Sequence, residues 1–302
     1  MKINTLSGRG TKTLMQHFTT VSKALSMVSA FTCLALTLTS CTKESTTNTA
    51  QAGTNDTTAQ TETLRIAAAA NLSDVLPDIV EAYKVDRKLP AQDIEVTFAS
   101  SGKLYAQITA GAPYDIFLSA NQTFPAKLAD ELANKSPESE KTYKPFTYTQ
   151  GQLALYSVTK PMNGFNQATL VDLFTTNPNS KITIANPELA PYGESAKAYL
   201  QSQNIYDSLN EQKRIIQAEN IGQAFQYAHT GSVDYGFVAQ SQVTAIEAIP
   251  EQFYILPPDS YPPILQDGMV ITASATATDF TDYLRSPAGQ AYFSKAGYLA
   301  VK

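Results

Sequence analysis

The sequence is poor in the side chains that bind metals through sulfur or imidazole. It contains two cysteines, two histidines and no tryptophan. Cys33, Cys41 and His17 all fall within the first 41 residues, so the chain beyond them has His229 alone. This excludes a disulfide, an iron–sulfur cluster or a cysteine zinc site in that part of the chain. A single histidine cannot form a histidine-rich metal site, and we expect His229 on a helix surface. No direct protein–metal ligands and no cofactor are predicted.

Positive charge is also scarce beyond the N-terminal segment. The first 40 residues hold four basic residues and no acidic one, and the rest carries 18 Lys and Arg against 27 Asp and Glu, a net charge of −9. Nucleic-acid binding requires a basic surface, so nucleic acid is excluded as a partner. Any anion bound by this protein must be held by local geometry and not by the overall field.

The N-terminal segment has the features of an export signal. An apolar stretch over 24–38 follows a basic flank, and its length is typical of a signal peptide and too short for a membrane-spanning helix. It ends in Leu38-Thr39-Ser40-Cys41, which resembles a bacterial lipobox. We therefore expect a lipoprotein signal peptide over 1–40 and lipidation of Cys41. An ordinary signal peptide with an incidental cysteine is the alternative.

The segment 41–63 is predicted to be a disordered tether. Between Thr42 and Thr63 it contains no Leu, Ile, Val or aromatic residue, so it cannot bury apolar area to offset its chain entropy. As a flexible coil it would span about 25 Å. A lipid anchor followed by a tether predicts a protein of the cell envelope, in the periplasm or on the outer face of the membrane.

The remainder alternates short apolar runs with stretches of helical periodicity, beginning with a strand in "LRIAAAAN" and a helix in "LSDVLPDIVEAYKVD". Such alternation predicts an α/β fold with mostly parallel sheets flanked by helices. We expect two similar lobes. Lobe 1 comprises 64–148, with 264–302 returning to it and "FTDYLRSPAGQAYFSKAGY" forming a closing helix, and lobe 2 comprises 149–263.

Four predicted strand-to-helix junctions carry polar residues with little charge. Two fall in each lobe: Ala70-Asn71, Ser100-Ser101-Gly102, Pro191-Tyr192-Gly193 and Asn220-Ile221-Gly222. Ligands of open α/β sheets bind where strands end and helices begin, and the free N–H groups of a helix start favour anions. A cleft between the lobes would bring the four junctions together. Taken alone, Ser101 has a simpler interpretation as a helix N-cap.

Motifs of the common enzymes are absent. Ser101-Gly102-Lys103 resembles the end of a phosphate-binding loop, but Thr97 and Leu104 stand where that motif requires Gly and Ser or Thr. There is no G-x-S-x-G, no H-E-x-x-H and no histidine placed to activate a serine. Lys103 is expected to face solvent, and Asp115 is expected to be a structural cap or turn residue. We predict that the protein is not an enzyme.

At these junctions the sequence resembles the molybdate-binding proteins of bacterial ABC importers, a branch of the extracytoplasmic solute-binding proteins. The resemblance runs from about Leu64 to Lys302. It rests on "AAAANLSDVLPDI", "FASSGKLYAQITAGAPYDIFLSAN", "ANPELAPYGESAKAYL", "AENIGQAF" and "SPAGQAYFSKAGY". It implies the two-lobed type II periplasmic-binding-protein fold with the ligand in the interlobe cleft.

The resemblance also implies four oxyanion-binding residues. Asn71 follows the first strand, Ser101 is the second serine of the "ASS" turn, Tyr192 lies between Pro and Gly, and Ile221 offers its backbone N–H. Some members use a tyrosine hydroxyl at the position of Ala239, and we expect Tyr192 to supply the phenol instead. Alternatively, Tyr192 is an aromatic residue on the cleft rim without ligand contact.

The chemistry of these residues is consistent with a dianion that carries no proton. The Ser101 and Tyr192 hydroxyls, the Asn71 amide and backbone N–H groups are all donors. The predicted function is capture of molybdate, and also tungstate, for delivery to an ABC permease with its cytoplasmic ATPase. We expect a monomer attached to the membrane only through its lipid. The same fold binding sulfate or another oxyanion, a phosphate-handling enzyme, and a surface lipoprotein with only an interaction role remain as alternatives.

Overall fold

The structure is a computed structural model that describes residues 62–135 and 143–301. These residues fall within one compact unit. The predicted signal peptide over 1–40, Cys41 and almost all of the predicted tether over 41–63 lie outside the described residues. Within 62–135 and 143–301, no helix combines the length and the apolar character needed to cross a membrane.

Sheet A contains five strands in the order β2-β1-β3-β10-β4. Strand β1 is parallel to β2 and β3, whereas β10 is antiparallel to β3 and β4. The strands are β1 (Leu64–Ala69), β2 (Ile94–Ala99), β3 (Ile116–Leu118), β4 (Phe146–Gly151) and β10 (Ile264–Val270). Strand β10, from the C-terminal part of the chain, therefore lies between β3 and β4, which come from its N-terminal half.

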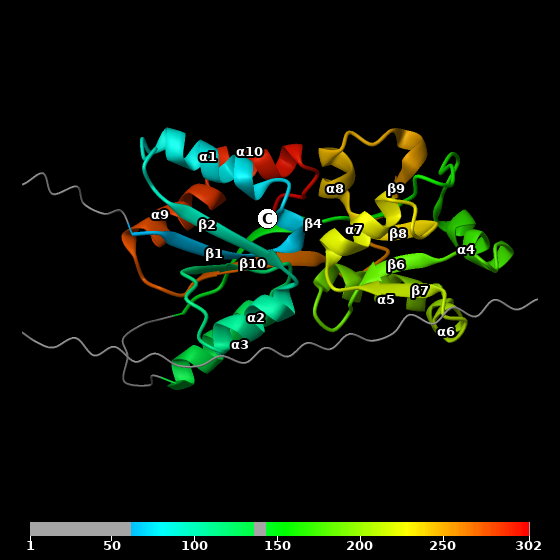
Figure 1. Cartoon of the computed structure of the whole chain (residues 1–302), viewed down its shortest axis with the longest axis horizontal. Helices are drawn as coiled ribbons and strands as arrows, with labels where there is room; N and C mark the ends of the chain where they lie inside the picture. The colour runs from blue at the N-terminus through cyan, green and yellow to red at the C-terminus, as the bar shows by residue number, and fades with distance from the viewer. Residues whose placement is uncertain (1–61, 136–142, 302) are drawn as a thin grey trace, which may run out of the picture. The chain divides into compact units, whose positions relative to one another are not determined.

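Helices cover both faces of sheet A (Figure 1). One face carries α1 (Leu76–Asp86), α9 (Ala275–Arg285) and α10 (Pro287–Lys295), and the other carries α2 (Ser101–Thr109) and α3 (Thr123–Lys135). Tyr83 of α1 meets Phe280 of α9 edge to face with ring centroids 5.2 Å apart. Such a pair adds about 0.5–1.5 kcal/mol beyond its area burial.

The prediction of one closing helix was wrong, because α9 and α10 are separate. Ser286 lies between them, and its hydroxyl accepts a hydrogen bond from Gly289 N–H, which caps α10. Pro287 at the first position of α10 has no N–H to continue the preceding helix.

Sheet B repeats the arrangement with the strand order β7-β6-β8-β5-β9. Strand β6 is parallel to β7 and β8, and β5 is antiparallel to β8 and β9. The strands are β5 (Leu153–Tyr156), β6 (Ile182–Ala185), β7 (Ile215–Ala218), β8 (Tyr235–Ala239) and β9 (Phe253–Ile255). The helices are α4 (Gln167–Thr176), α5 (Pro191–Ser202), α6 (Tyr206–Glu211), α7 (Ile221–His229) and α8 (Gln240–Ala245).

The predicted α/β class with helix-flanked sheets is confirmed, but each sheet is mixed and not mostly parallel. Two of the four strand pairs in each sheet are antiparallel. The antiparallel strands β4, β5, β9 and β10 are the segments by which the chain passes from sheet A to sheet B and back. The alternation of strands and helices in the sequence predicts only the parallel strand pairs. The strands that cross between the sheets are not each followed by a helix, so this pattern does not predict their antiparallel pairing.

The crossing point lies directly beside a predicted site residue. Strand β4 ends at Gly151 and β5 begins at Leu153. A Cβ atom at Gly151 would lie 2.1 Å from the Tyr192 hydroxyl oxygen. Only glycine leaves room for that tyrosine, so the crossing between the sheets and the position of Tyr192 are coupled.

Candidate functional site

The four predicted junctions converge on one small cavity between sheet A and sheet B. The centre of a water-sized sphere can move through about 10 Å³ of it, so the cavity is small. This excludes a bulky ligand in the described conformation. No charged side chain is among the residues that line it, which are Ala69, Ala70, Asn71, Ser100, Ser101, Ala120, Ala190, Pro191, Tyr192, Asn220 and Ile221.

Ser101 is the first residue of α2 and not its N-cap, so the simpler interpretation of this serine was wrong. Ser100 occupies the cap position without a side-chain capping bond. The Ser101 hydroxyl oxygen instead accepts a hydrogen bond of 2.9 Å from Ala120 N–H, after β3. That bond fixes the oxygen and leaves the hydroxyl hydrogen available to donate. The side chain is 1% exposed, so a ligand at this point is largely shielded from water.

Asn71 lies in a 3₁₀ turn (Ala70–Leu72) that directly follows β1. Its side-chain nitrogen donates to Gln266 Oε1 and to the Tyr298 hydroxyl, both at 3.0 Å. Its side-chain oxygen is buried and has no hydrogen-bond partner among the described residues. In this orientation the Asn71 side-chain atom that remains without a partner is the oxygen, a hydrogen-bond acceptor, whereas the sequence analysis predicted that the Asn71 amide acts as a donor.

Tyr192 enters the cavity from the first turn of α5, where Pro191 supplies the helix start. Its hydroxyl accepts a hydrogen bond of 3.3 Å from Gln266 Nε2 and keeps its own hydrogen to donate. Burial, reinforced by the nearby Tyr298, Tyr261 and Tyr148 phenols, raises the pKa of Tyr192 well above its ordinary value. The phenol therefore stays neutral and protonated near pH 7. Tyr192 lines the cavity, and its ring does not stand on an exposed rim.

Ile221 is the first residue of α7. Asn220 caps this helix, and its side-chain oxygen accepts from Gln223 N–H at 3.0 Å. The first N–H groups of a helix have no intrahelical partner. Within the described part of the chain, the backbone N–H groups of Ser101, Tyr192 and Ile221 have no hydrogen-bond acceptor. Three helix starts thus present unpaired donors and positive dipole ends to one cavity, an arrangement that favours an anion.

The side chain of Lys103 is exposed, as the sequence predicted. It forms an ion pair with Glu219, which precedes α7, and both side chains are about half exposed. Next to it, Gly102 N–H donates to Leu189 O at 2.9 Å. These two contacts join the turn after β2 to the loops of sheet B outside the cavity. The charges of Lys103 and Glu219 neutralise each other there.

A second layer of polar side chains surrounds the cavity and escaped the sequence interpretation. Gln266, Tyr148 and Tyr298 are all buried and all hydrogen-bond to predicted site residues or to one another. The polar pair Gln266-Asp267 inside the strand Ile264–Val270, whose other residues are apolar or glycine, is the signal that was available for Gln266. Ser100 and Asn220, which line the cavity, belong to the predicted junctions but were not singled out.

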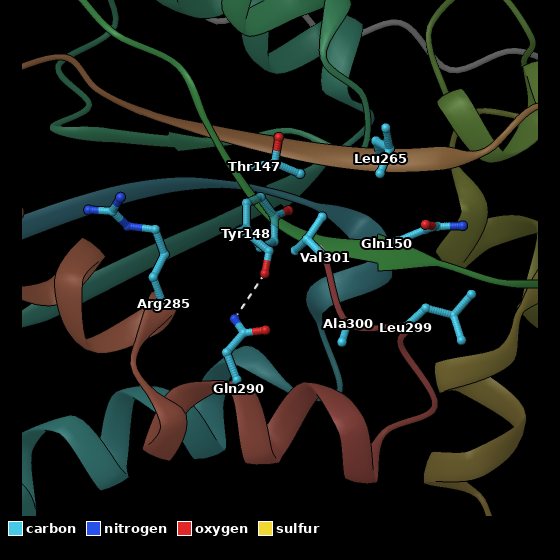
Figure 2. A pocket seen from close by; sticks show the side chains of 9 residues that line it. All are labelled: Thr147, Tyr148, Gln150, Leu265, Arg285, Gln290, Leu299, Ala300 and Val301. Atoms are coloured by element: carbon cyan, nitrogen blue, oxygen red, sulfur yellow. Dashed lines mark hydrogen bonds between the residues drawn. The ribbon is translucent and has the colours of Figure 1, made fainter.

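A larger cavity of about 870 Å³ lies elsewhere, between the β4–β10 edge of sheet A and the end of the chain (Figure 2). It contains none of the four junctions. Its lining includes Arg285, Gln290 and the C-terminal residues Leu299 and Val301. Because the four junctions line the small cavity and not this larger one, the small cavity is the better candidate site.

Within the described part of the chain, no group of three or more His, Cys, Asp or Glu side chains could hold a metal ion.

Comparison with known proteins agrees with this geometry. The model of the family described as bacterial extracellular solute-binding protein matches residues 64–299. The molybdate-binding protein ModA of Rhodobacter capsulatus is 32% identical over 237 residues, which cover 77% of this chain and 86% of that protein. ModA of Azotobacter vinelandii is 30% identical over 244 residues, with 80% and 91% covered.

The solved periplasmic molybdate-binding protein of Azotobacter vinelandii matches with a TM-score of 0.69 at 31% identity, covering 79% of this chain and 100% of that chain. The chain belongs to the bacterial extracellular solute-binding protein family. The predicted type II periplasmic-binding-protein fold is thereby confirmed. The sulfate-binding protein SubI of Mycobacterium tuberculosis, with a TM-score of 0.59 at 13% identity, shares the fold alone.

Proposed function

We propose that this protein captures molybdate, and also tungstate, in the cavity between the two sheets. The observation that carries the proposal is the convergence of unpaired backbone N–H groups and neutral hydroxyl donors on one uncharged cavity. A fully deprotonated tetrahedral oxyanion needs only donors. An anion that bears a proton would also need an acceptor.

The proposed ligands are the hydroxyls of Ser101 and Tyr192, the amide of Asn71 and the backbone N–H of Ile221. Neutral donors that are fixed before binding cost little reorganisation, and an undersized anion leaves some of them unpaired. The relatives named as molybdate-binding support the choice of ligand. The metal would be held as its oxyanion, with no direct bond from protein to molybdenum and no resident cofactor.

The protein would act as a carrier and perform no chemistry. We propose that it works as a monomer, anchored outside the cytosol through lipidated Cys41 and a tether over 41–63. It would deliver the anion to an ABC permease driven by a cytoplasmic ATPase. The likeness to a putative ABC transporter substrate-binding lipoprotein of Bacillus subtilis, 27% identical over 245 residues, supports the anchored arrangement.

Isothermal titration of the purified protein with molybdate, tungstate, sulfate and phosphate tests the proposal. We expect submicromolar molybdate and tungstate binding, weaker sulfate binding and no measurable phosphate binding. Tighter binding of sulfate than of molybdate would make this a sulfate carrier with the same fold. The absence of a heat signal and of a thermal shift with all four anions would refute the oxyanion site.

A further inference from the structure

Ser100 carries a buried hydroxyl at the candidate site that is not among the proposed ligands. The residue directly follows β2, whose last residue Ala99 is paired with Ala69 of β1, and it lines the small cavity. Its exposed fraction is 3%, so more than nine-tenths of it is buried. Its hydroxyl oxygen has no hydrogen-bond partner among the described residues. Buried polar atoms in native proteins are nearly always paired, so this one requires a physical explanation.

Helix capping is the simplest role for a serine at this position, and the hydrogen bonds contradict it. Ser100 is the N-cap of α2, and its φ of −64° and ψ of 145° are typical of a capping residue. An N-cap side chain normally accepts from the second or third N–H of its helix, but Ser100 makes no such bond within the described part of the chain. The second of these groups, Gly102 N–H, donates at 2.9 Å to Leu189 O, from the loop that precedes α5.

The hydrogen of the Ser100 hydroxyl is not taken by another side chain of the cavity. Asn71 Oδ1 is likewise without a partner among residues 62–135 and 143–301, so these two atoms do not bond to each other. The hydroxyls of Ser101 and Tyr192 accept their hydrogen bonds from other groups. Ser100 therefore keeps a free hydrogen to donate beside the donors already described.

We propose that the Ser100 hydroxyl is a further ligand-binding group of this site and donates its hydrogen to an oxygen of the bound oxyanion. Ser100 and Ser101 then bind the anion from the same turn. The Ser101 oxygen is fixed by Ala120 N–H, whereas the Ser100 hydroxyl has no protein partner to give up. This inference rests on the proposed oxyanion-binding function and adds one donor to it.

The absence of a protein partner among the described residues gives Ser100 an energetic signature of its own. In the described conformation its hydroxyl opposes folding, because it has lost water and gained no hydrogen bond. In the complex it gains a charged acceptor, and such bonds are stronger than those between neutral groups. Removing the hydroxyl should therefore weaken the complex without destabilising the free protein. Ser101 differs, because Ala120 N–H depends on its hydroxyl oxygen.

Ser100→Ala tests the inference, because it removes the hydroxyl and keeps the Cβ atom. Isothermal titration gives the dissociation constant of molybdate, and thermal unfolding gives the melting temperature of the free protein. We expect the dissociation constant to rise about tenfold or more, which is the size of one hydrogen bond to a charged group. The melting temperature of the free protein should equal that of the wild type or exceed it.

Two variants outside the cavity are matched controls. The Thr183 hydroxyl in β6 is also buried and without a partner in the part of the chain that the structure describes, so Thr183→Val removes an equivalent group away from the ligand. Ser274 is the N-cap of α9 and accepts from Ala277 N–H at 3.1 Å, so Ser274→Ala removes a functioning cap. Both should leave the dissociation constant unchanged, and only Ser274→Ala should lower the melting temperature.

Two results would overturn the inference. An unchanged dissociation constant in Ser100→Ala shows that the hydroxyl does not bind the anion. A weaker affinity together with a melting temperature lowered as in Ser274→Ala shows that Ser100 supports the start of α2 and affects binding only through it. Failure of the wild-type protein to bind any oxyanion is a separate result, because it refutes the proposed function and this inference with it.

A crystal structure of the tungstate complex provides a direct readout. We expect the Ser100 hydroxyl oxygen to lie about 2.5–3.0 Å from an oxygen of the anion, the usual range for a hydrogen bond between oxygens. A separation beyond about 3.5 Å contradicts the inference even if the other proposed donors contact the anion.

Discussion

Lys103 at the start of α2 and Glu219 before α7 form an ion pair that joins the two lobes outside the candidate site. The pair lies beside the backbone hydrogen bond from Gly102 to Leu189, so two independent contacts hold the lobes together at this point. A carrier must separate these contacts to release a ligand from the cavity behind them.

Removing the ion pair should accelerate ligand release with only a small loss of affinity. Both side chains are about half exposed, and exposed pairs contribute about 0–1 kcal/mol. We expect Lys103→Met to raise the molybdate dissociation rate up to about fivefold at low salt, and less at high salt because ions screen the pair. Stopped-flow measurements give the molybdate dissociation rate at low and at high salt. Lys84→Met, which breaks the Lys84–Glu81 pair within α1, is the control and should leave the dissociation rate unchanged at both salt concentrations.

Ser101→Ala should weaken oxyanion binding by about 1–3 kcal/mol, because one oxygen of the anion loses its donor. The protein should also lose stability, because Ala120 N–H loses its acceptor. Ser286→Ala removes the cap of α10 at a similar cost in stability and serves as the control, because it lies outside the cavity. Calorimetric titration and thermal unfolding separate the two effects. Equal affinities of Ser101→Ala and wild type would remove Ser101 from the site.

Gly151→Ala should displace Tyr192 and so reduce both stability and affinity. Its Cβ would lie 2.1 Å from the Tyr192 hydroxyl oxygen, and such overpacking costs about 1–3 kcal/mol. Gly268→Ala is a matched control in sheet A, because its Cβ would meet the Phe146 ring at 2.8 Å and not Tyr192. Both variants should unfold at lower temperature, and only Gly151→Ala should bind molybdate more weakly. A Gly151→Ala protein with wild-type affinity would contradict the coupling of Gly151 to Tyr192.

Stability should fall steeply above about pH 10, the ordinary pKa of tyrosine. Burial raises the pKa of Tyr83, Tyr199 and Tyr235 to about 12, so the folded state keeps protons that the unfolded chain has lost. The resulting stabilisation is complete below about pH 10 and is lost as pH rises toward 12. Each such phenol contributes a slope of up to about 1.4 kcal/mol per pH unit. Urea unfolding between pH 8 and 11.5 measures how the free energy of unfolding depends on pH. Tyr199→Phe should make this dependence less steep by the contribution of one phenol.

Features coded by adjacent residues were predictable, and those that depend on distant partners were not. The four junctions were found because a strand end followed by a small or polar helix start is a local pattern. The ion pair of Lys103 was missed because Glu219 lies 116 positions away. The link between Asn71 and Gln266 spans 195 positions, so only the folded chain reveals it. The division of α9 from α10 was predictable from Ser286 and Pro287, whose capping pattern was overlooked.

The uncharged lining of the cavity has a consequence for the heat of binding. The Tyr192 phenol holds its proton far above neutral pH, and none of the described residues that line the site is Asp, Glu, His, Lys or Arg. Loading a fully deprotonated anion therefore moves no proton between protein and solvent. The calorimetric enthalpy should be identical in buffers of different ionisation enthalpy, and the anion itself should be the only component whose protonation limits uptake in acid.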